Sequence, residues 1–267
     1  MKGLLEGKVA IITGAGSGVG RAATLLFTRH GAKVVAADID AAAAEETVAQ
    51  AKAEGGSARA VRCDVSDAAA VDEAVQIAVT TFGRLDVIYN NAGVTIEPTP
   101  GQTRPNRLMD TTPEQMARLH GINVGGVLNG CRAAIRQFEK QGGGGAIVNT
   151  NSVAGLMGWG GVVYGATKGA VTMITRTLAL EVAAQGIRVN SVCPAAMLTK
   201  FAGMGKFAPM SDEAKQRIAA QHPLGRTIDP VDCANAALFL ASDLASNITG
   251  VNLPVDGGLS AGVPPRR

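Results

Sequence analysis

The chain has 267 residues, of which 46% are hydrophobic, 18% charged and 3% aromatic, and its formal net charge is +3. This length suits one large α/β domain and is short for two, so we expect residues 1–267 to form a single domain. The basic residues are scattered and form no face interleaved with aromatic residues, which leaves nucleic-acid binding without support. With no apolar leader and no apolar run long enough to span a bilayer, the sequence predicts a cytoplasmic protein with no membrane partner.

The four cysteines, Cys63, Cys131, Cys193 and Cys233, lie far apart and include no Cys-x-x-Cys pair. This spacing is typical of free thiols in a reducing compartment. It predicts neither a disulfide framework nor a metal site.

The first predicted strand, residues 8–13, runs directly into the glycine-rich turn 14–20. Glycines let the backbone turn tightly and approach a ligand, because no Cβ intervenes. The N-terminus of the helix predicted for residues 21–29 offers free N–H groups and a partial positive charge to a phosphate. A tight strand–helix connection without a ligand would look the same at this point. The candidate pyrophosphate contacts in the turn are Gly14, Ser17, Gly18 and Val19.

The second predicted strand, residues 33–38, ends on Asp38. In a doubly wound fold, a carboxylate at this position accepts hydrogen bonds from the adenosine ribose and repels a 2′-phosphate. No basic residue adjoins it, and Ser17 occupies the turn position before Gly18, so the sequence favours NAD over NADP. A solvated acid at a strand end is the alternative. Asp64 and the backbone of Val65, at the end of the next strand, are candidates for the adenine edge, although Asp64 could equally serve its own loop.

The remaining elements alternate between helices and strands. We predict helices at 41–54, 67–82, 112–141 and 164–185, strands at 58–65, 85–89, 146–152 and 251–255, and a loop at 95–110. The helix start at Thr112 carries the strongest local signal, because Thr as N-cap is followed by Pro and, three residues on, by Gln. Asn123 lies inside that helix in a small and apolar stretch, so its amide must find partners.

Tyr164 and Lys168 are four residues apart at the start of a long predicted helix, and therefore on one face of it. A nearby ammonium favours the phenolate, so we expect Lys168 to lower the pKa of Tyr164. A phenol tuned in this way can take a proton from an alcohol near neutral pH. Ser152, at the end of the preceding strand, can hydrogen-bond the substrate oxygen during that transfer.

Together these features resemble a classical short-chain dehydrogenase/reductase, from about Gly7 to Gly258. The matching motifs are Thr13-Gly-x-x-x-Gly-x-Gly20, Asn90-Asn-Ala-Gly93, Asn123, Ser152, Tyr164-x-x-x-Lys168, Arg188-Val-Asn190 before an expected sixth strand, and Gly250 to Gly258. The resemblance implies a doubly wound, Rossmann-like α/β fold with a mostly parallel seven-stranded sheet and helices on both faces.

The family's site residues are carried over only where the motifs match. By resemblance, Tyr164 is the acid/base, Ser152 polarises the substrate oxygen, and Lys168 also holds the nicotinamide ribose. Asn123 would complete a water-linked proton relay to Lys168. The resemblance further implies cofactor contacts by Asn91, Ala92, Gly93, Pro194, Met197 and Thr199.

The sequence departs from the family pattern at three places. Ala195 replaces the usual Gly after Pro194, the stretch between Ser152 and Tyr164 is slightly short, and residues 106–110 form a modest insertion near the expected site entrance. By resemblance, about residues 197–225 cover the substrate, and their Met and Phe residues suit an adaptable apolar lid. Packing onto the fold or onto a neighbouring subunit is the alternative for these side chains.

These expectations favour an NAD-dependent dehydrogenase acting on an apolar or cyclic secondary alcohol or its ketone. An NADP-dependent 3-oxoacyl or other ketone reductase shares every catalytic residue, and a non-catalytic NAD-binding sensor or scaffold is the alternative from another class. A methyltransferase would not require the Tyr–Lys pair. The helix from Tyr164 is apolar on more than one face and needs a partner beyond its own sheet, which, with the resemblance, predicts a homotetramer.

Overall fold

A computed structural model describes residues 3–96, 107–197, 199, 201 and 211–262. Its core is a seven-stranded sheet, in which every pair of neighbouring strands is parallel and the strand order is β3-β2-β1-β4-β5-β6-β7. The strands are β1 Val9–Thr13, β2 Lys33–Asp38, β3 Ser57–Arg62, β4 Val87–Asn90, β5 Gly145–Thr150, β6 Ile187–Pro194 and β7 Asn252–Val255. The doubly wound fold expected from the sequence is confirmed.

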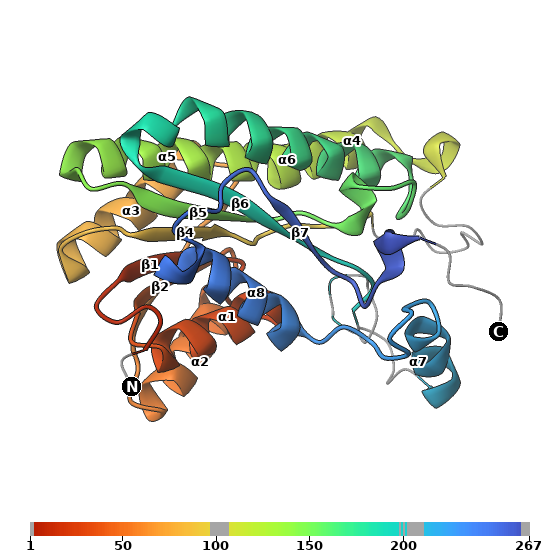
Figure 1. The fold of residues 1–267 in the computed structure, drawn as a ribbon, viewed down its shortest axis with the longest axis horizontal. Coiled ribbons are helices and arrows are strands. Elements are labelled where there is room, and N and C mark those ends of the chain that lie inside the picture. Colours follow the sequence, from red (N-terminus) through yellow and green to blue (C-terminus); the bar gives the residue numbers. More distant parts are fainter. Residues whose placement is uncertain (1–2, 97–106, 198, 200, 202–210, 263–267) are drawn as a thin grey trace.

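Helices cover both faces of the sheet (Figure 1). The described helices are α1 Gly18–Arg29, α2 Ala41–Ala53, α3 Ala68–Phe82, α4 Pro113–His120, α5 Gly126–Gln141, α6 Val162–Glu181, α7 Asp212–Ala219 and α8 Pro230–Ala241. One core cluster joins α1, α2 and α8 to the sheet, and another joins α3, α5 and α6 to its opposite face. Because both faces are covered, the central strands are buried and their sequences are nearly continuous apolar runs.

The strand order creates a crevice at the carboxyl ends of β1 and β4. The chain moves outward from β1 to β2 and β3, then returns to place β4 on the other side of β1. Connections that leave two neighbouring strands in opposite directions open a space between them, and ligands of doubly wound folds bind there. The glycine turn follows β1 and the Asn-Asn-Ala-Gly segment follows β4, so both lie at this crevice.

Several element boundaries differ from the sequence predictions. Helix α1 begins at Gly18 and not at Arg21, because the Arg21 N–H already donates to the Ser17 carbonyl (3.1 Å). Strand β3 ends at Arg62, where its partner β2 ends at Asp38. Helix α6 begins at Val162, two residues before Tyr164, and ends at Glu181, and a 3-10 turn follows to Gln185.

The predicted helix 112–141 has two parts. Its Thr112 start is confirmed, with the complete capping box to Gln115. A π-helical turn at Gly121–Gly125 then separates α4 from α5. Such turns insert one extra residue per turn and occur frequently at functional sites.

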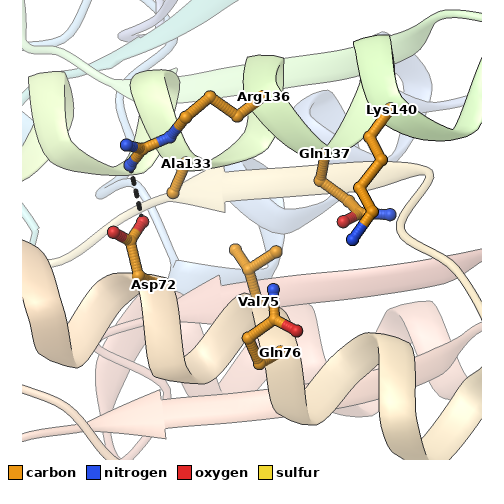
Figure 2. A pocket seen from close by; sticks show the side chains of 7 residues that line it. All are labelled: Asp72, Val75, Gln76, Ala133, Arg136, Gln137 and Lys140. Carbon is orange, nitrogen blue, oxygen red and sulfur yellow. Dashed lines mark hydrogen bonds and ion pairs between the residues drawn. The ribbon is translucent and has the colours of Figure 1, made fainter.

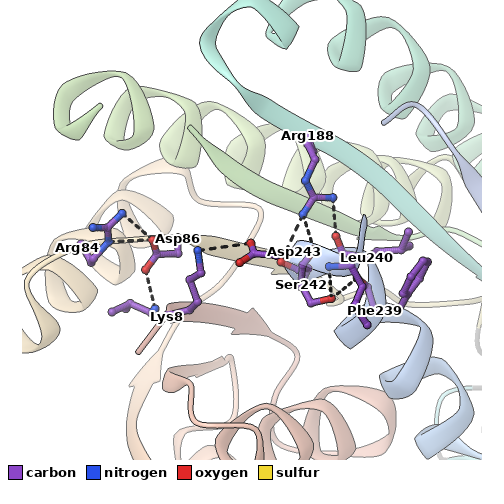
Figure 3. Close-up of polar contacts among 11 residues, drawn as sticks. Lys8, Arg84, Asp86, Arg188, Phe239, Leu240, Ser242 and Asp243 are labelled. Atoms are coloured by element: carbon purple, nitrogen blue, oxygen red, sulfur yellow. Dashed lines mark hydrogen bonds and ion pairs between the residues drawn. The ribbon is translucent and has the colours of Figure 1, made fainter. Parts of the chain in front are cut away.

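Residues Arg188 to Asn190 lie inside β6 and not before it, which corrects the sequence expectation. The strand starts at Ile187 because it pairs there with Gly145 at the start of β5. Arg188 reaches across to the C-terminus of α8, where its guanidinium donates to the carbonyls of Leu240 (2.8 Å) and Ser242 (3.2 Å) (Figure 3). In another part of the same figure, buried Asp86 pairs with Arg84 (2.8 Å) and accepts from the Val9 N–H (2.8 Å).

Candidate active site

The glycine turn leaves open space in front of the N-terminus of α1. Gly14 and Gly18 have positive φ angles of 65° and 49°, which favour glycine. A Cβ on Gly20 would lie 2.0 Å from the Gly14 carbonyl oxygen, so no side chain fits there, whereas a Cβ on Gly18 would approach only Thr199 Cγ2, at 4.0 Å, among the described atoms. Ser17 makes no side-chain cap, and no acidic residue lies in the first turn. The free N–H groups and the open space fit a phosphate of a dinucleotide.

Asp38 lies beside this turn and helps to hold it. Its Oδ2 accepts from the Gly16 N–H (2.8 Å) and its Oδ1 from the Asp40 N–H (2.9 Å). On the other side of Gly16, Arg21 donates to the Gly16 carbonyl (2.7 Å) and pairs with Glu46 (2.7 Å). The carboxylate is therefore fixed at the end of β2, where the sequence predicted it.

Asp64 serves its own loop in this structure. Its Oδ1 accepts from the backbone N–H (2.9 Å) and the hydroxyl (2.7 Å) of Ser66, and these bonds hold the pKa of Asp64 below its usual value. Val65 is buried, and its carbonyl accepts from Asn129 Nδ2 (2.9 Å), a contact the sequence did not suggest. The local role that the sequence left open for Asp64 is thus present, and adenine binding by Asp64 and Val65 stays a prediction.

The segment Asn91–Gly93 is fixed against the glycine turn by Thr13, which sequence reasoning assigned no role. Thr13 Oγ1 accepts from the backbone N–H groups of Asn91 and Ala92, each at 3.0 Å. The Asn91 amide donates in turn to the Thr13 carbonyl (3.0 Å). The threonine that opens the glycine motif was the available signal for this contact.

Ser152, Tyr164 and Lys168 are all nearly buried, with exposed fractions of 5%, 8% and 3%. Ser152 follows the end of β5, where its hydroxyl accepts from the Ala154 N–H (3.1 Å) and lies 3.4 Å from the Pro194 carbonyl. Lys168 Nζ donates to the Thr150 carbonyl (2.9 Å) and lies 5.7 Å from the centre of the Tyr164 ring. The structure brings the three predicted catalytic residues to the carboxyl end of one strand.

The pKa values in this cluster correct one expectation. Burial raises the pKa of Tyr164 to about 12, against a smaller lowering by the hydrogen bond with Ser152. Burial also lowers the pKa of Lys168 to about 8. The expected net lowering of the Tyr164 pKa is therefore wrong, because loss of hydration outweighs the hydrogen bond with Ser152, and stabilisation of the phenolate by Lys168 stays a prediction.

Asn123 is fully buried in the π-helical turn and clamps the backbone of Val94. Its Oδ1 accepts from the Val94 N–H (2.8 Å) and its Nδ2 donates to the Val94 carbonyl (2.9 Å) and to Thr167 Oγ1 (3.3 Å). A Cβ on Gly93 would lie 3.3 Å from Asn123 Oδ1 and 3.8 Å from Lys168 Nζ. Asn123 is thus close to the lysine, and the proton relay stays a prediction.

The remaining predicted cofactor contacts lie at the end of β6 and in the residues that follow it. Ala195 is buried, and its N–H donates to the Val255 carbonyl (3.3 Å), so alanine fits where the family has glycine. Met197 forms an isolated parallel bridge with Ile228, and its sulfur lies 3.8 Å from Cys233 Sγ. Thr199 is the residue that faces Gly18.

An apolar wall surrounds the Tyr164 ring. A cluster of buried residues and partly buried neighbours comprises Val94, Ile96, Met116, Leu119, Ala154, Trp159, Val163 and Tyr164. Phe201 packs edge-on against Tyr164, with ring centres 6.1 Å apart. Much of the predicted lid 197–225, namely residues 198, 200 and 202–210, lies outside the described residues. Of the predicted insertion 106–110, only residue 106 lies outside them, and Leu108–Asp110 form a 3-10 turn.

A shallow groove of about 210 Å³ lies between α3 and α5 (Figure 2). It is lined by Asp72, Val75, Gln76, Ala133, Arg136, Gln137 and Lys140, and the Asp72–Arg136 ion pair (2.7 Å) crosses it. None of the predicted catalytic or cofactor-binding residues lines this groove. Within the described part of the chain, no cluster of three or more potential metal ligands and no helix long and apolar enough to cross a membrane is found.

Comparisons with known proteins agree with this geometry. Residues 14–260 match a family model described as enoyl-(acyl carrier protein) reductase. A 2,5-dichloro-2,5-cyclohexadiene-1,4-diol dehydrogenase of Sphingobium indicum is 39% identical over 98% of this chain and 100% of its own. Meso-2,3-butanediol dehydrogenase of Serratia marcescens is 40% identical over 96% of both chains, and 3beta-hydroxysteroid dehydrogenase 1 of Eggerthella lenta is 39% identical over 96% and 95%.

A solved structure shares the fold. The crystal structure of a short-chain dehydrogenase/reductase from Burkholderia xenovorans superimposes with a TM-score of 0.86 and 36% identity, over 98% of this chain and 100% of that one. The glycine turn, strands β2 to β7 and the Ser–Tyr–Lys cluster lie within the range 14–260 that the family model matches. The chain belongs to the short-chain dehydrogenase/reductase family.

Proposed function

We propose that this protein transfers a hydride between NAD(H) and a secondary alcohol or its ketone. The observation that carries the proposal is the convergence of Ser152, Tyr164 and Lys168 beside a glycine turn built for a phosphate. A tyrosine that is held next to a lysine and a serine in a nearly buried site is a proton-transfer arrangement. A sensor or scaffold would need the glycine turn alone.

In this proposal the nicotinamide would accept or donate the hydride, and side chains of the protein transfer the proton. In this proposal Tyr164 reacts as a phenolate, which takes the hydroxyl proton of the alcohol as the carbonyl forms, and as a phenol it returns that proton to the oxygen in the reverse direction. Ser152 donates a hydrogen bond to that oxygen and orients it. Lys168, fixed on the Thr150 carbonyl, places a positive charge beside the phenol as the phenolate develops.

The preference for NAD is supported by Asp38. Its carboxylate is fixed beside the turn by Gly16 and Asp40, and Ile39 follows it. The neighbouring Arg21 is already engaged by Gly16 and Glu46, so this guanidinium is not free for a 2′-phosphate. A negative charge at this position disfavours NADP.

The proposed substrate is an apolar or cyclic secondary alcohol. The wall around Tyr164 is apolar and aromatic, which suits a ring or a short hydrocarbon skeleton. The relatives named above act on a cyclic diol, on butanediol and on a steroid alcohol, which supports this class. A 3-oxoacyl-[acyl-carrier-protein] reductase of Thermotoga maritima, 37% identical over 96% of this chain, keeps ketone reduction with NADPH as the second candidate.

Calorimetric titration with NAD(H) and NADP(H), followed by absorbance of the reduced nicotinamide, tests the proposal. The panel would hold cyclohexane-1,2-diol, 2,3-butanediol, a 3β-hydroxysteroid and a 3-oxoacyl thioester. We expect NAD(H) binding and turnover of an alcohol, and a fall of about 10³-fold in turnover for Tyr164→Phe with cofactor binding retained. Stronger binding of NADP(H) would favour the reductase, and binding of neither cofactor would refute both.

We further propose that the protein is a cytoplasmic homotetramer. Helix α6 exposes Met173 (53%) and Leu180 (82%), seven residues apart on one face, and α5 exposes Leu128 (40%). Apolar side chains this exposed on neighbouring helices are typical of an interface between subunits. The cysteines, all buried as free thiols, are compatible with a reducing compartment.

A further inference from the structure

A polar chain runs from the core of the sheet to the glycine turn. Tyr89 of β4 is fully buried, and its ring stacks on Phe27 of α1 with centres 6.4 Å apart. Its hydroxyl lies 2.9 Å from Thr150 Oγ1 at the end of β5. Thr150 Oγ1 lies 3.1 Å from Asn91 Oδ1. Three residues from two strands and the following turn are thus connected.

The chemistry of the groups fixes the direction of this chain. A threonine hydroxyl has one hydrogen, and an amide oxygen can only accept, so Thr150 donates to Asn91 and accepts from Tyr89. The Asn91 Nδ2 then points to the turn, where it donates to the carbonyls of Thr13 (3.0 Å) and Gly14 (3.4 Å). Without the hydroxyl of Thr150, the Asn91 oxygen would lose the donor that fixes the amide orientation.

The Asn91 amide fills the underside of the glycine turn. Its nitrogen would lie 2.8 Å from a Cβ on Gly20 and 3.2 Å from one on Gly14. The backbone carbonyl of the same Thr150 accepts from Lys168 Nζ (2.9 Å). The Thr150 side chain therefore contacts Asn91, which supports the glycine turn, and the Thr150 backbone contacts Lys168, the predicted catalytic lysine.

We infer that Thr150 is a positioning residue that fixes Asn91 beneath the glycine turn and so sets the affinity for the dinucleotide cofactor. The inference rests on the proposed function for the identity of that ligand. The inference also predicts that the Thr150 hydroxyl makes residues 13–20 more rigid, and this rigidity can be measured on the protein without a cofactor.

Three variants separate this role from general stability. Thr150→Val keeps the β-branched shape and removes the hydroxyl, and Thr150→Ser returns the hydroxyl. Thr175→Val is the control, because the buried Thr175 hydroxyl accepts from Asn149 Nδ2 (3.1 Å), and Asn149 bonds Asn90 and not the Asn91 amide beneath the glycine turn. Thr150→Val loses the bonds to Asn91 and Tyr89, and Thr175→Val loses the bond from Asn149. We therefore expect both variants to lower thermal stability, Thr150→Val by more, so affinity and exchange carry the comparison.

The readouts are the dissociation constant for NAD by calorimetry, the kinetic constants, and hydrogen–deuterium exchange of a peptide covering residues 13–20 in the cofactor-free protein. For Thr150→Val we expect the dissociation constant for NAD to rise about tenfold and the cofactor KM to rise by a similar factor. The change in kcat should be smaller, and hydrogen exchange in that peptide should be faster. Thr150→Ser and Thr175→Val should stay within about twofold of the wild type in affinity.

Unchanged exchange and affinity in Thr150→Val, or an equal loss in Thr175→Val, would overturn the inference. A failure of the wild type to bind NAD or NADP would instead refute the proposed function. In that case the exchange comparison between Thr150→Val and Thr175→Val alone decides the role of Thr150.

Discussion

Both tyrosines of the chain are buried, yet their neighbours suit them to different tasks. Burial raises the pKa of each phenol, to about 12 for Tyr164 and further for Tyr89. Tyr89 meets only the neutral hydroxyl of Thr150, so it remains a fixed donor. Tyr164 lies beside the Lys168 ammonium and the Ser152 hydroxyl, which can stabilise a developing phenolate. The environment of the phenol, and not its residue type, distinguishes the tyrosine that we propose as the acid/base.

Asp38→Asn should change the cofactor preference. The variant removes the negative charge that disfavours a 2′-phosphate, and weakens the acceptors for the ribose, so we expect about a tenfold or larger fall in the ratio of NAD to NADP affinity. Calorimetric titration with both cofactors measures this ratio. Asp40→Asn is the control, because Asp40 caps α2 through Ala43 and asparagine caps equally well. An unchanged ratio in Asp38→Asn would contradict the assignment.

Lys168 should leave a signature in the pH dependence of stability. Its pKa is about 8 in the folded protein and 10.5 unperturbed, so between these values the unfolded chain binds more protons. The stability of the wild type relative to Lys168→Met should therefore rise with pH, by about 2 kcal/mol between about pH 7.5 and 9.5. The difference cancels Cys63, Cys131 and Cys233, whose raised pKa values act in the opposite direction in both proteins. Cys193 does not cancel fully, because the Lys168 charge lowers its pKa in the wild type. Denaturant unfolding of both proteins across this pH range measures the difference in their free energies of unfolding. A difference that does not change with pH would contradict the prediction.

At the scale of elements, local signals predicted most helices and strands to within a few residues. The capping box at Thr112 and the glycines after α3 and α5 act on neighbouring residues, so the sequence shows them directly. The π-helical turn could not be predicted in this way. It presents Asn123 to Val94, which lies 29 residues earlier in the chain, and no local pattern encodes that contact.

Arg188 should stabilise the C-terminus of α8. Its guanidinium serves carbonyls at the end of that helix, which would otherwise lack protein partners of this strength. We expect Arg188→Met to lower the free energy of unfolding by about 1–3 kcal/mol, with unchanged kinetic constants. Arg136→Met removes only an exposed ion pair with Asp72 and should cost less than about 1 kcal/mol. Equal losses of the free energy of unfolding in the two variants would show that the contacts of Arg188 with α8 stabilise the protein no more than an exposed ion pair does.

At the scale of the whole molecule, the strand order explains why the predicted site residues lie together. Candidates from four separate segments, around residues 14, 91, 152 and 164, meet because parallel strands end at one edge of the sheet. Their supports were less visible: Thr150 binds Asn91 across 59 residues and Asp38 binds Gly16 across 22. Sequence spacing identifies residues on one helix, such as Tyr164 and Lys168, whereas contacts between elements depend on packing.

The proposed homotetramer predicts that α6 lies at an interface between subunits. Light scattering of the wild type should give four chain masses. Replacing Met173 and Leu180 by Glu should yield smaller species, because two charges would be buried between subunits. Leu4→Glu, at a partly exposed leucine before β1, should leave the mass unchanged. A wild-type monomer at working concentration would refute the proposal.

The bridge between Met197 and Ile228 has an evolutionary consequence. It brings together the two ends of a 30-residue excursion between β6 and α8, so the excursion is anchored at its base. Lengthening an anchored loop costs little, about 0.6 kcal/mol for each doubling of its length. Away from Thr199 and Phe201, which face Gly18 and Tyr164, insertions and exchanges within this excursion can therefore accumulate without moving Tyr164, Ser152 or the glycine turn. Substrate range and hydride chemistry can diversify at independent rates within one chain.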